Sequence, residues 1–155
     1  MKIVVVGAGT AGLVTALILK QKFNQNIDLK IIKSDDIGII GVGEGSTEHT
    51  GYLPYVLNNG IFGKKYLSKK IDPRNPRPVN QLHFDTYKLN KYLQKKCIER
   101  NITIQEDTIK EVKLNKNGIE SIKGKKKYTA DFFIDCTGFR RVLINKFKNR
   151  WISFS

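Results

Sequence analysis

Hydrophobic residues near the start of the chain follow two different periods. Residues 2–6 form a continuous, mainly β-branched apolar run, which is typical of a parallel strand buried on both faces. Residues 13–23 carry apolar side chains at helical spacing, and residues 27–32 form a second apolar run. A strand, a loop, a helix and a strand within about thirty residues predict a βαβ unit.

The middle of the chain has a weaker pattern. Residues 34–45 form a glycine-rich loop, and residues 47–58 favour a helix that Gly51 and Pro54 weaken. Glycine and proline interrupt residues 61–82, so we expect an irregular connector there.

Helical spacing returns after this connector. Asp85 can cap a helix that runs to Arg100, because its carboxylate can accept hydrogen bonds from the first free amides. The expected apolar side of this helix consists of Tyr87, Leu89, Tyr92, Leu93 and Cys97.

Mostly extended segments follow. Residues 102–105 predict a strand, and residues 108–114 and 118–123 alternate around an Asn-Gly pair that favours a hairpin turn. Residues 127–135 predict another strand, and residues 141–148 are expected to be helical. The predicted fold class is α/β, a Rossmann-like βαβ domain with an inserted β-hairpin.

The turn between the first strand and the first helix carries the clearest chemical motif. Residues 7–12 read G-x-G-x-x-G directly after a strand and at the start of a helix. Gly7 allows a tight turn, Gly9 lets the backbone approach a pyrophosphate, and Gly12 lets the helix pack on the sheet. Free amides and the helix dipole favour an anion there, so the motif predicts a dinucleotide site. A glycine-rich turn without a ligand is the alternative.

The position that usually binds ribose departs from this fingerprint. An acid is expected about twenty residues after the glycines, at the end of the second strand. Lys33 stands there instead, followed by Ser34, Asp35 and Asp36. The cation would suit the 2′-phosphate of NADP, or the contact is lost and Ser34 or Asp35 serves in its place. Both interpretations stay open.

Net charge changes this picture little. The chain of 155 residues carries a formal charge of +14, but its lysines are scattered through every segment rather than gathered in one patch. Aromatic residues do not alternate with arginines as they do on nucleic-acid platforms. We expect no nucleic-acid partner and no membrane association.

Length and cysteine usage indicate a simple organisation. The length suits one domain, residues 1–155, with residues 1–46 as its βαβ core. Cys97 and Cys136 lie far apart without a CxxC pair, which argues against a zinc site or a disulfide framework. A reducing, cytoplasmic location is expected.

Three further segments resemble the flavin-dependent halogenases, that is, the tryptophan halogenases and their relatives. Residues 37–47 contain Gly-Val-Gly-Glu-Gly-Ser, similar to the family's G-V-G-E-[AG]-[ST] loop. Residues 82–90 contain His-Phe-Asp at a helix start, and residues 131–140 resemble D-x-F-I-D-C-[ST]-G-F. Together with the glycine turn, these segments lie in family order and span nearly the whole chain.

The resemblance implies FAD as the cofactor and an FAD/NAD(P)-binding fold that is incomplete relative to the family. It also implies a reaction in which FADH2, oxygen and halide halogenate an aromatic substrate such as an indole. A separate flavin reductase would supply the FADH2.

The resemblance also implies a set of site residues. The expected cofactor-binding residues are Gly7, Gly9, Thr10, Ala11, Gly12, Ser34, Ile37, Val42, Gly43, Gly45 and Ile109. Ile109 matches a family position whose backbone faces the adenine, with a core strand residue as the alternative. Asp135 is either a ligand-binding residue at a strand end or a turn residue. Glu44 and His83 are read as structural, and no catalytic or metal-binding residue is assigned.

Parts of the family pattern are missing in two places, one internal and one terminal. The family's catalytic lysine segment lies between the glycine loop and the His-Phe-Asp helix, but residues 48–82 contain no such segment, as if residues had been deleted at 61–82. The W-x-W-x-I-P signature and the later substrate domain are also missing, and residues 151–155 look like the interior of a domain cut open.

The predicted function is therefore the FAD-binding portion of a halogenase-like oxidoreductase, not catalytically complete as this chain. A non-catalytic nucleotide-binding remnant, or one piece of a split flavoenzyme, is the alternative. Another flavin- or NAD(P)-dependent oxidoreductase is a third possibility, for which Lys33 is the hint.

Overall fold

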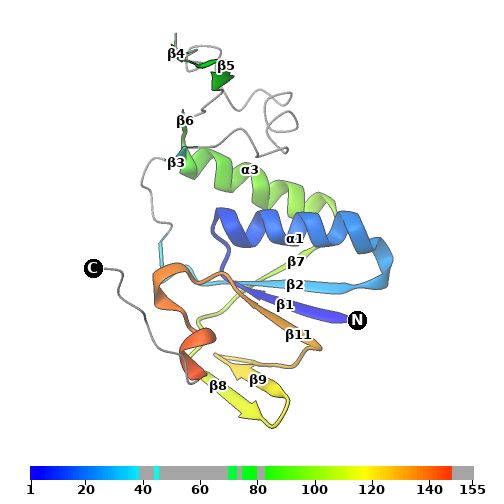
Figure 1. The fold of residues 1–155 in the computed structure, drawn as a ribbon. Coiled ribbons are helices and arrows are strands. Elements are labelled where there is room, and N and C mark those ends of the chain that lie inside the picture. The colour runs from blue at the N-terminus through cyan, green and yellow to red at the C-terminus, as the bar shows by residue number, and fades with distance from the viewer. Residues whose placement is uncertain (39–43, 46–69, 73–74, 80–82, 148–155) are drawn as a thin grey trace, which may run out of the picture. The chain divides into compact units, whose positions relative to one another are not determined.

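A computed structural model describes residues 1–38, 44–45, 70–72, 75–79 and 83–147 (Figure 1). The chain divides into two compact units, one formed by residues 1–38 with 92–155 and the other by residues 39–91. Each unit is described by itself. The expected single domain over residues 1–155 and its βαβ core over residues 1–46 stay predictions.

The first unit is built on a four-stranded parallel sheet with the order β11-β1-β2-β7. Its strands are β1 (Lys2–Val6), β2 (Asp28–Lys33), β7 (Thr103–Glu106) and β11 (Phe132–Asp135). Helix α1 (Thr10–Phe23) and the short η1 (Asn24–Asn26) connect β1 to β2, which confirms the predicted βαβ unit. The apolar run in β1 is buried, with Val4 and Val5 fully inaccessible to solvent, as a strand covered on both faces requires.

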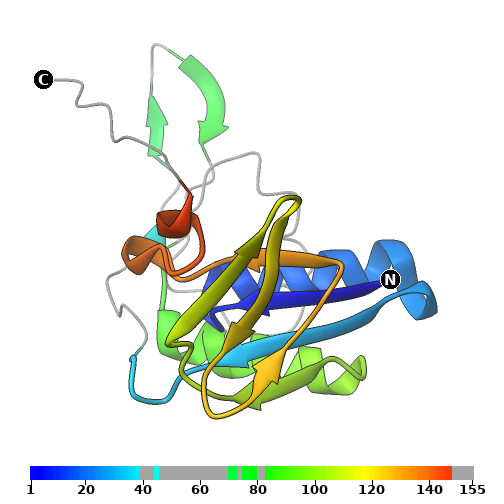
Figure 2. The same ribbon diagram turned by 90° about the horizontal axis from the view of Figure 1, so that it is seen from below.

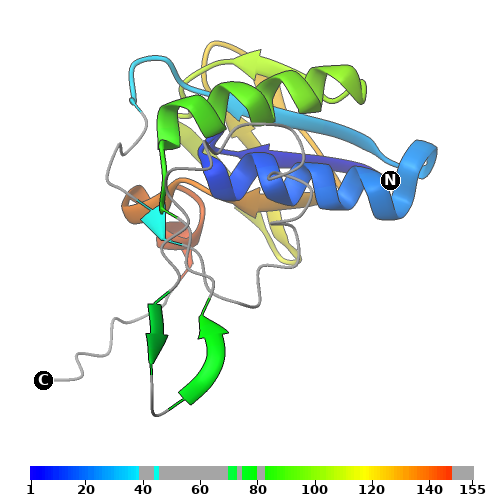
Figure 3. The same cartoon turned by 90° about the horizontal axis from the view of Figure 1, so that it is seen from above.

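Helix α3 (Thr86–Glu99) begins where the sequence predicted. Asp85 Oδ1 accepts hydrogen bonds from the amides of Tyr87 and Lys88, both at 3.0 Å, so Asp85 caps the helix. In the first unit, the C-terminal half of α3 runs beside α1 (Figure 3), and the Cys97 thiol lies 3.8 Å from the Leu13 carbonyl oxygen. The expected place of Tyr87 on the apolar side is wrong, because that side chain is 55% exposed in the first turn of the helix.

A small antiparallel sheet covers the face of the parallel sheet opposite α1 (Figures 1 and 2). It consists of β8 (Glu111–Asn115), β9 (Gly118–Lys123) and β10 (Lys127–Tyr128). The predicted Asn-Gly turn joins β8 to β9, with Gly118 at a φ of +132°. Ile122 and Tyr128 pack with Val4 and Val6 in one buried cluster, so the inserted hairpin shares the core of the parallel sheet.

Two expected elements after this sheet are wrong. The strand expected over residues 127–135 is interrupted, because β10 and β11 belong to different sheets. The Asp131 carboxylate accepts a hydrogen bond of 2.7 Å from the Lys2 amide where the chain crosses between them. In place of the helix expected over residues 141–148, the described residues 141–147 contain only the short 3₁₀ turn η4 (Ile144–Lys146), which follows the 3₁₀ turn η3 (Gly138–Arg140). Arg141 lies between them in the left-handed region, at a φ of +48°.

The second unit contains two short antiparallel pairs in its described residues. Strand β3 (Glu44–Gly45) pairs with β6 (His83–Phe84), and β4 (Lys70–Asp72) pairs with β5 (Asn75–Val79). The second pair lies within the span expected to be an irregular connector. The helix expected over residues 47–58 falls outside the described residues. None of the helices in the described part of the chain has the length and apolar character needed to cross a membrane.

Candidate dinucleotide-binding site

The glycine turn lies at the carboxyl edge of the parallel sheet, between the ends of two neighbouring strands. The Gly7 amide donates to the carbonyl oxygen of Ile32 in β2 at 2.9 Å. On the other side, the Cys136 amide donates to the carbonyl oxygen of Val6 at 2.8 Å. In open α/β sheets this edge is where ligands bind.

Two of the three motif glycines are required by the chain itself. Gly7 has a φ of +110°, and a Cβ there would overlap the carbonyl group of Cys136. A Cβ on Gly12 would overlap the carbonyl oxygen of Gly7. Conformation and packing therefore demand both glycines whether or not a ligand binds.

Gly9 differs from them in both respects. Its backbone is extended, with φ −72° and ψ −179°, which any residue can adopt. A Cβ on Gly9 would meet no protein atom within 4 Å among the described residues. Nothing in the described chain explains the glycine, whereas a phosphate that approaches the backbone from this open side would require it.

The start of helix α1 is also open to an anion. Leu13 N donates to the carbonyl oxygen of Gly9 at 3.1 Å, and the amides of the first turn have no intrahelical acceptor. The N-cap residue, Gly9, has no side chain that could cap this end, and the first turn contains no acidic residue. The partial positive charge of the helix start is therefore not compensated by a carboxylate of that turn.

Side chains at the end of β2 form a connected network. Lys33 Nζ lies 2.6 Å from Asp35 Oδ1. The hydroxyls of Ser34 and Thr108 lie 2.7 Å apart, and Thr108 Oγ1 donates to Asp36 Oδ2 at 2.9 Å. The hydrogen bond from Lys33 is the main cause that lowers the pKa of Asp35, which stays ionised at neutral pH.

Asp107, just after β7, is a buried carboxylate that the sequence analysis missed. It accepts hydrogen bonds from the Thr108, Lys125 and Lys126 amides and from the Tyr128 hydroxyl, at 2.7–3.0 Å. Burial raises the pKa of Asp107, but these hydrogen bonds outweigh burial and hold the pKa at about 2. Gly124 is required here, because a Cβ would overlap the carboxylate. An Asp directly after a strand and followed by Thr is a turn signal that could have identified it.

Asp135, at the end of β11, is a turn residue. Its carboxylate accepts hydrogen bonds from the amide and hydroxyl of Thr137 and from the amides of Leu143 and Ile144, at 2.6–3.1 Å. Burial raises the pKa of Asp135, but the hydrogen bonds outweigh it and lower the pKa below its usual range. Of the two interpretations left open by the sequence, the structure shows the turn residue.

The predicted site residues fall into three groups. Those at the carboxyl edge of the sheet are Gly7, Gly9, Thr10, Ala11, Gly12 and Ser34. Ile37 follows in the next loop with 40% exposure, whereas Ile109 lies between β7 and β8 and its partly buried side chain packs against the buried cluster. Gly45 lies in β3 of the second unit, and Val42 and Gly43 lie outside the described residues. Cofactor binding by any of them stays a prediction.

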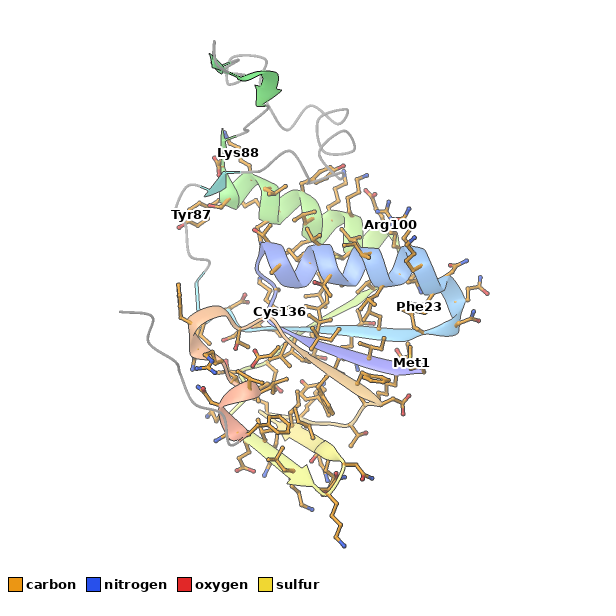
Figure 4. All side chains as sticks on the ribbon, in the orientation of Figure 1. Met1, Phe23, Tyr87, Lys88, Arg100 and Cys136 are labelled. Carbon is orange, nitrogen blue, oxygen red and sulfur yellow. The ribbon has the colours of Figure 1, made fainter. Side chains whose placement is uncertain are left out.

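Neither cysteine is an activated nucleophile. Burial raises the pKa of Cys97 to about 11 and also raises the pKa of Cys136, so both thiols stay protonated at neutral pH. Cys136 lies at the end of β11 beside β1 (Figure 4), 3.3 Å from where a Cβ on Gly12 would stand. Its role there is packing under the glycine turn.

Comparisons with known proteins agree on one family. The family model described as "Tryptophan halogenase" matches residues 2–58 and 61–155. Tryptophan 7-halogenase RebH of Lentzea aerocolonigenes is 24% identical over 231 aligned residues, which cover 94% of this chain and 44% of RebH. The solved structure of tryptophan 6-halogenase SttH from Streptomyces toxytricini has a TM-score of 0.72 at 22% identity, covering 99% of this chain and 47% of that one. The structure of MibH, described as a tryptophan 5-halogenase, has a TM-score of 0.76 at 22% identity, covering 94% and 41%. The chain thus spans less than half the length of these relatives.

Proposed function

The chain belongs to the tryptophan halogenase family, and we propose that its first unit is the FAD-binding portion of a flavin-dependent halogenase-like oxidoreductase. One observation supports this most directly. In the described part of the chain, neither backbone conformation nor packing requires a glycine at Gly9, the N-cap residue of α1. A bound diphosphate supplies the missing reason for it.

The residues present fit the diphosphate of FAD. Gly9, Thr10 and Ala11 would present backbone amides to the phosphates, and the α1 dipole would favour their negative charge. Gly7 and Gly12 would hold the turn in place through the contacts described above. Bound and reduced, the flavin would supply the reaction with oxygen that the family uses. Val42, Gly43 and Gly45 are proposed as further contacts because the resemblance assigns them.

We further propose that these 155 residues do not halogenate by themselves. The family match consists of two stretches, residues 2–58 and 61–155, which residues 59–60 separate. The alignment with RebH covers 231 residues, whereas this chain has 155. RebH therefore contains residues within the matched region that this chain lacks. This supports a missing internal segment where the catalytic lysine would be expected. Lys64, Lys65, Lys69 and Lys70 lie in the interval but have none of the flanking pattern.

A direct assay tests whether the chain halogenates by itself. The purified chain is supplied with FAD, a flavin reductase, oxygen, bromide and an indole, with a complete halogenase as the positive control. We expect no brominated product by mass spectrometry. Brominated indole above the level of a chain-free control would overturn the proposal of incompleteness.

Titration tests the cofactor separately. The change in flavin fluorescence gives the affinity for FAD, and calorimetry gives the affinity for NADPH. We expect FAD to bind more tightly. Tighter binding of NADPH would overturn the FAD assignment and favour an NADP-dependent oxidoreductase. The expected cytoplasmic location stays a prediction.

A split flavoenzyme is a second candidate, supported by one edge of the parallel sheet. Among the described residues, β11 is a terminal strand of the sheet, and Phe132 on it is 61% exposed. An exposed strand edge beside an apolar side chain is a surface that another segment can cover. An adjacent reading frame that encodes the W-x-W-x-I-P segment would favour this candidate, and its absence would favour a non-catalytic remnant.

A further inference from the structure

The end of β2 lies where the ribose of a bound dinucleotide would be recognised. Because the Gly7 amide bonds to the Ile32 carbonyl, the residues after Ile32 lie beside the phosphate turn. Lys33 occupies the usual acid position, and an ammonium group can only donate hydrogen bonds. It cannot accept the hydroxyl protons of a ribose, so the usual interaction has to come from another group.

Asp35 supplies a carboxylate at this place. Lys33 Nζ lies 2.6 Å from Asp35 Oδ1, and the two side chains are 35% and 49% exposed. The ammonium group therefore orients the carboxylate through one oxygen while the residue stays accessible to solvent. The acid of the fingerprint is present, but it has moved two positions along the chain and is oriented by the lysine that replaced it.

Ser34 is restricted to accepting hydrogen bonds from a ligand. A threonine hydroxyl has a single proton, and Thr108 donates it to Asp36. The 2.7 Å contact between Ser34 and Thr108 must therefore use the Ser34 proton, which leaves only the lone pairs of Ser34 Oγ. Ser34 and Asp35 are thus adjacent acceptors, which suits the two hydroxyl protons of a ribose diol.

The surrounding charges disfavour a phosphate on the ribose. Glu106 is the register partner of Lys33 on β7 and also interacts with Asp35. Asp35 already pairs the Lys33 ammonium group, and the neighbouring Asp36 adds a second carboxylate to this part of the chain. A 2′-phosphate would add two further negative charges to this group and would be repelled.

We propose that Ser34 and Asp35, with Asp35 oriented by Lys33, recognise the free 2′,3′-diol of the adenosine ribose and exclude 2′-phosphorylated dinucleotides. The inference rests on the proposed function, because it assumes that a dinucleotide occupies the glycine turn. It assigns the preference for an unphosphorylated ribose to two residues of this chain and makes no use of the flavin.

Calorimetry with three ligands tests it: ADP, 2′-deoxy-ADP and 2′-phospho-ADP. Wild type is expected to bind ADP about tenfold more tightly than 2′-deoxy-ADP, the value of one hydrogen bond to a charged acceptor. Binding of 2′-phospho-ADP should be weaker than that of ADP. Asp35→Ala should bring ADP and 2′-deoxy-ADP within about twofold of each other and improve the relative binding of 2′-phospho-ADP. Lys33→Met, which keeps the carboxylate but removes its orienting group, should give an intermediate preference for ADP.

Asp28→Ala is the matched control, because Asp28 is an exposed acid at the other end of β2. It should leave all three affinities unchanged. Full discrimination in Asp35→Ala, or tighter binding of 2′-phospho-ADP than ADP by wild type, would overturn the inference. If one of these two results is found while wild type still binds FAD, only the assignment of Ser34 and Asp35 is wrong, and the proposed function stands. If wild type binds neither FAD nor ADP, the proposed function falls with it.

Discussion

Two neighbouring turns at the carboxyl edge of the parallel sheet, one after β11 and one after β1, differ in how their polar groups are paired. After β11, the Asp135 carboxylate accepts four hydrogen bonds, all from donors of the same turn region. After β1, the N-cap residue Gly9 makes no side-chain hydrogen bond, and a Cβ on Gly9 would meet no atom of the described residues within 4 Å. Buried polar groups are normally hydrogen-bonded within the protein. The turn after β11 is thus satisfied by its own polar groups, and the contrast supports our proposal that the turn after β1 binds a ligand.

The same contrast exists inside the glycine motif. A side chain on Gly12 would overlap the backbone of Gly7, whereas a side chain on Gly9 would touch no described atom. The glycines of the motif look equivalent in the sequence, but each position requires a glycine for a different reason. Substitutions at these glycines and at the paired carboxylate Asp107 test this contrast, and they follow in order of their expected effect on stability.

Gly12→Val should have the largest effect. The valine side chain would enter space that the Gly7 carbonyl occupies, and α1 would have to move away from the sheet. We expect a loss of more than about 4 kcal/mol in the free energy of unfolding, enough to prevent cooperative folding. Urea denaturation followed by circular dichroism measures it. A variant within about 1 kcal/mol of wild type would show that the turn is not packed as described.

Asp107→Ala should come next. Its removal leaves the Tyr128 hydroxyl and three backbone amides without their acceptor. We expect a loss of about 3 kcal/mol, measured by the same denaturation, because unpaired buried donors retain their desolvation cost. Asp28→Ala, which removes an exposed acid, should change stability by less than about 0.5 kcal/mol. Equal effects of the two substitutions would contradict the role of Asp107.

The pH dependence of stability should follow from the same carboxylate. The pKa of Asp107 is about 2 in the folded protein, below its ordinary value of 3.8, so the folded state binds this proton less readily than the unfolded state. The stabilisation is fully present above pH 3.8 and is lost as the pH falls toward 2. Its size is about 2 kcal/mol. Denaturation at a series of pH values should show a shallower acid loss in Asp107→Asn, and an unchanged acid loss would contradict it.

The sequence predicted those parts of the fold that depend on local pattern. The βαβ unit, the Asp85 cap and the Asn-Gly hairpin each follow from residues close together in the chain. The break in the strand expected over 127–135 depends on a contact between Asp131 and Lys2, which are 129 positions apart. No local period reveals such a contact.

The site was predicted to a similar extent. The glycine turn was found because its spacing is a local signal. Asp107 was missed because two of its partners, Lys125 and Lys126, lie about one hairpin further along the chain. The helix expected over residues 141–148 failed for a related reason. The amides of Leu143 and Ile144 bond to the Asp135 carboxylate, and this preference is visible only when the turn is folded.

Gly9→Val separates ligand binding from folding, and of these substitutions it should have the smallest effect on stability. The backbone at Gly9 is extended and a Cβ there would meet no described atom within 4 Å, so the free energy of unfolding should stay within about 1 kcal/mol of wild type, the cost of replacing Gly by Val at a helix N-cap. Titration with FAD should show a loss of affinity of at least about a hundredfold, because the valine would occupy the approach of the diphosphate. A folded Gly9→Val variant that binds FAD as tightly as wild type would contradict the assignment of this turn as the cofactor site.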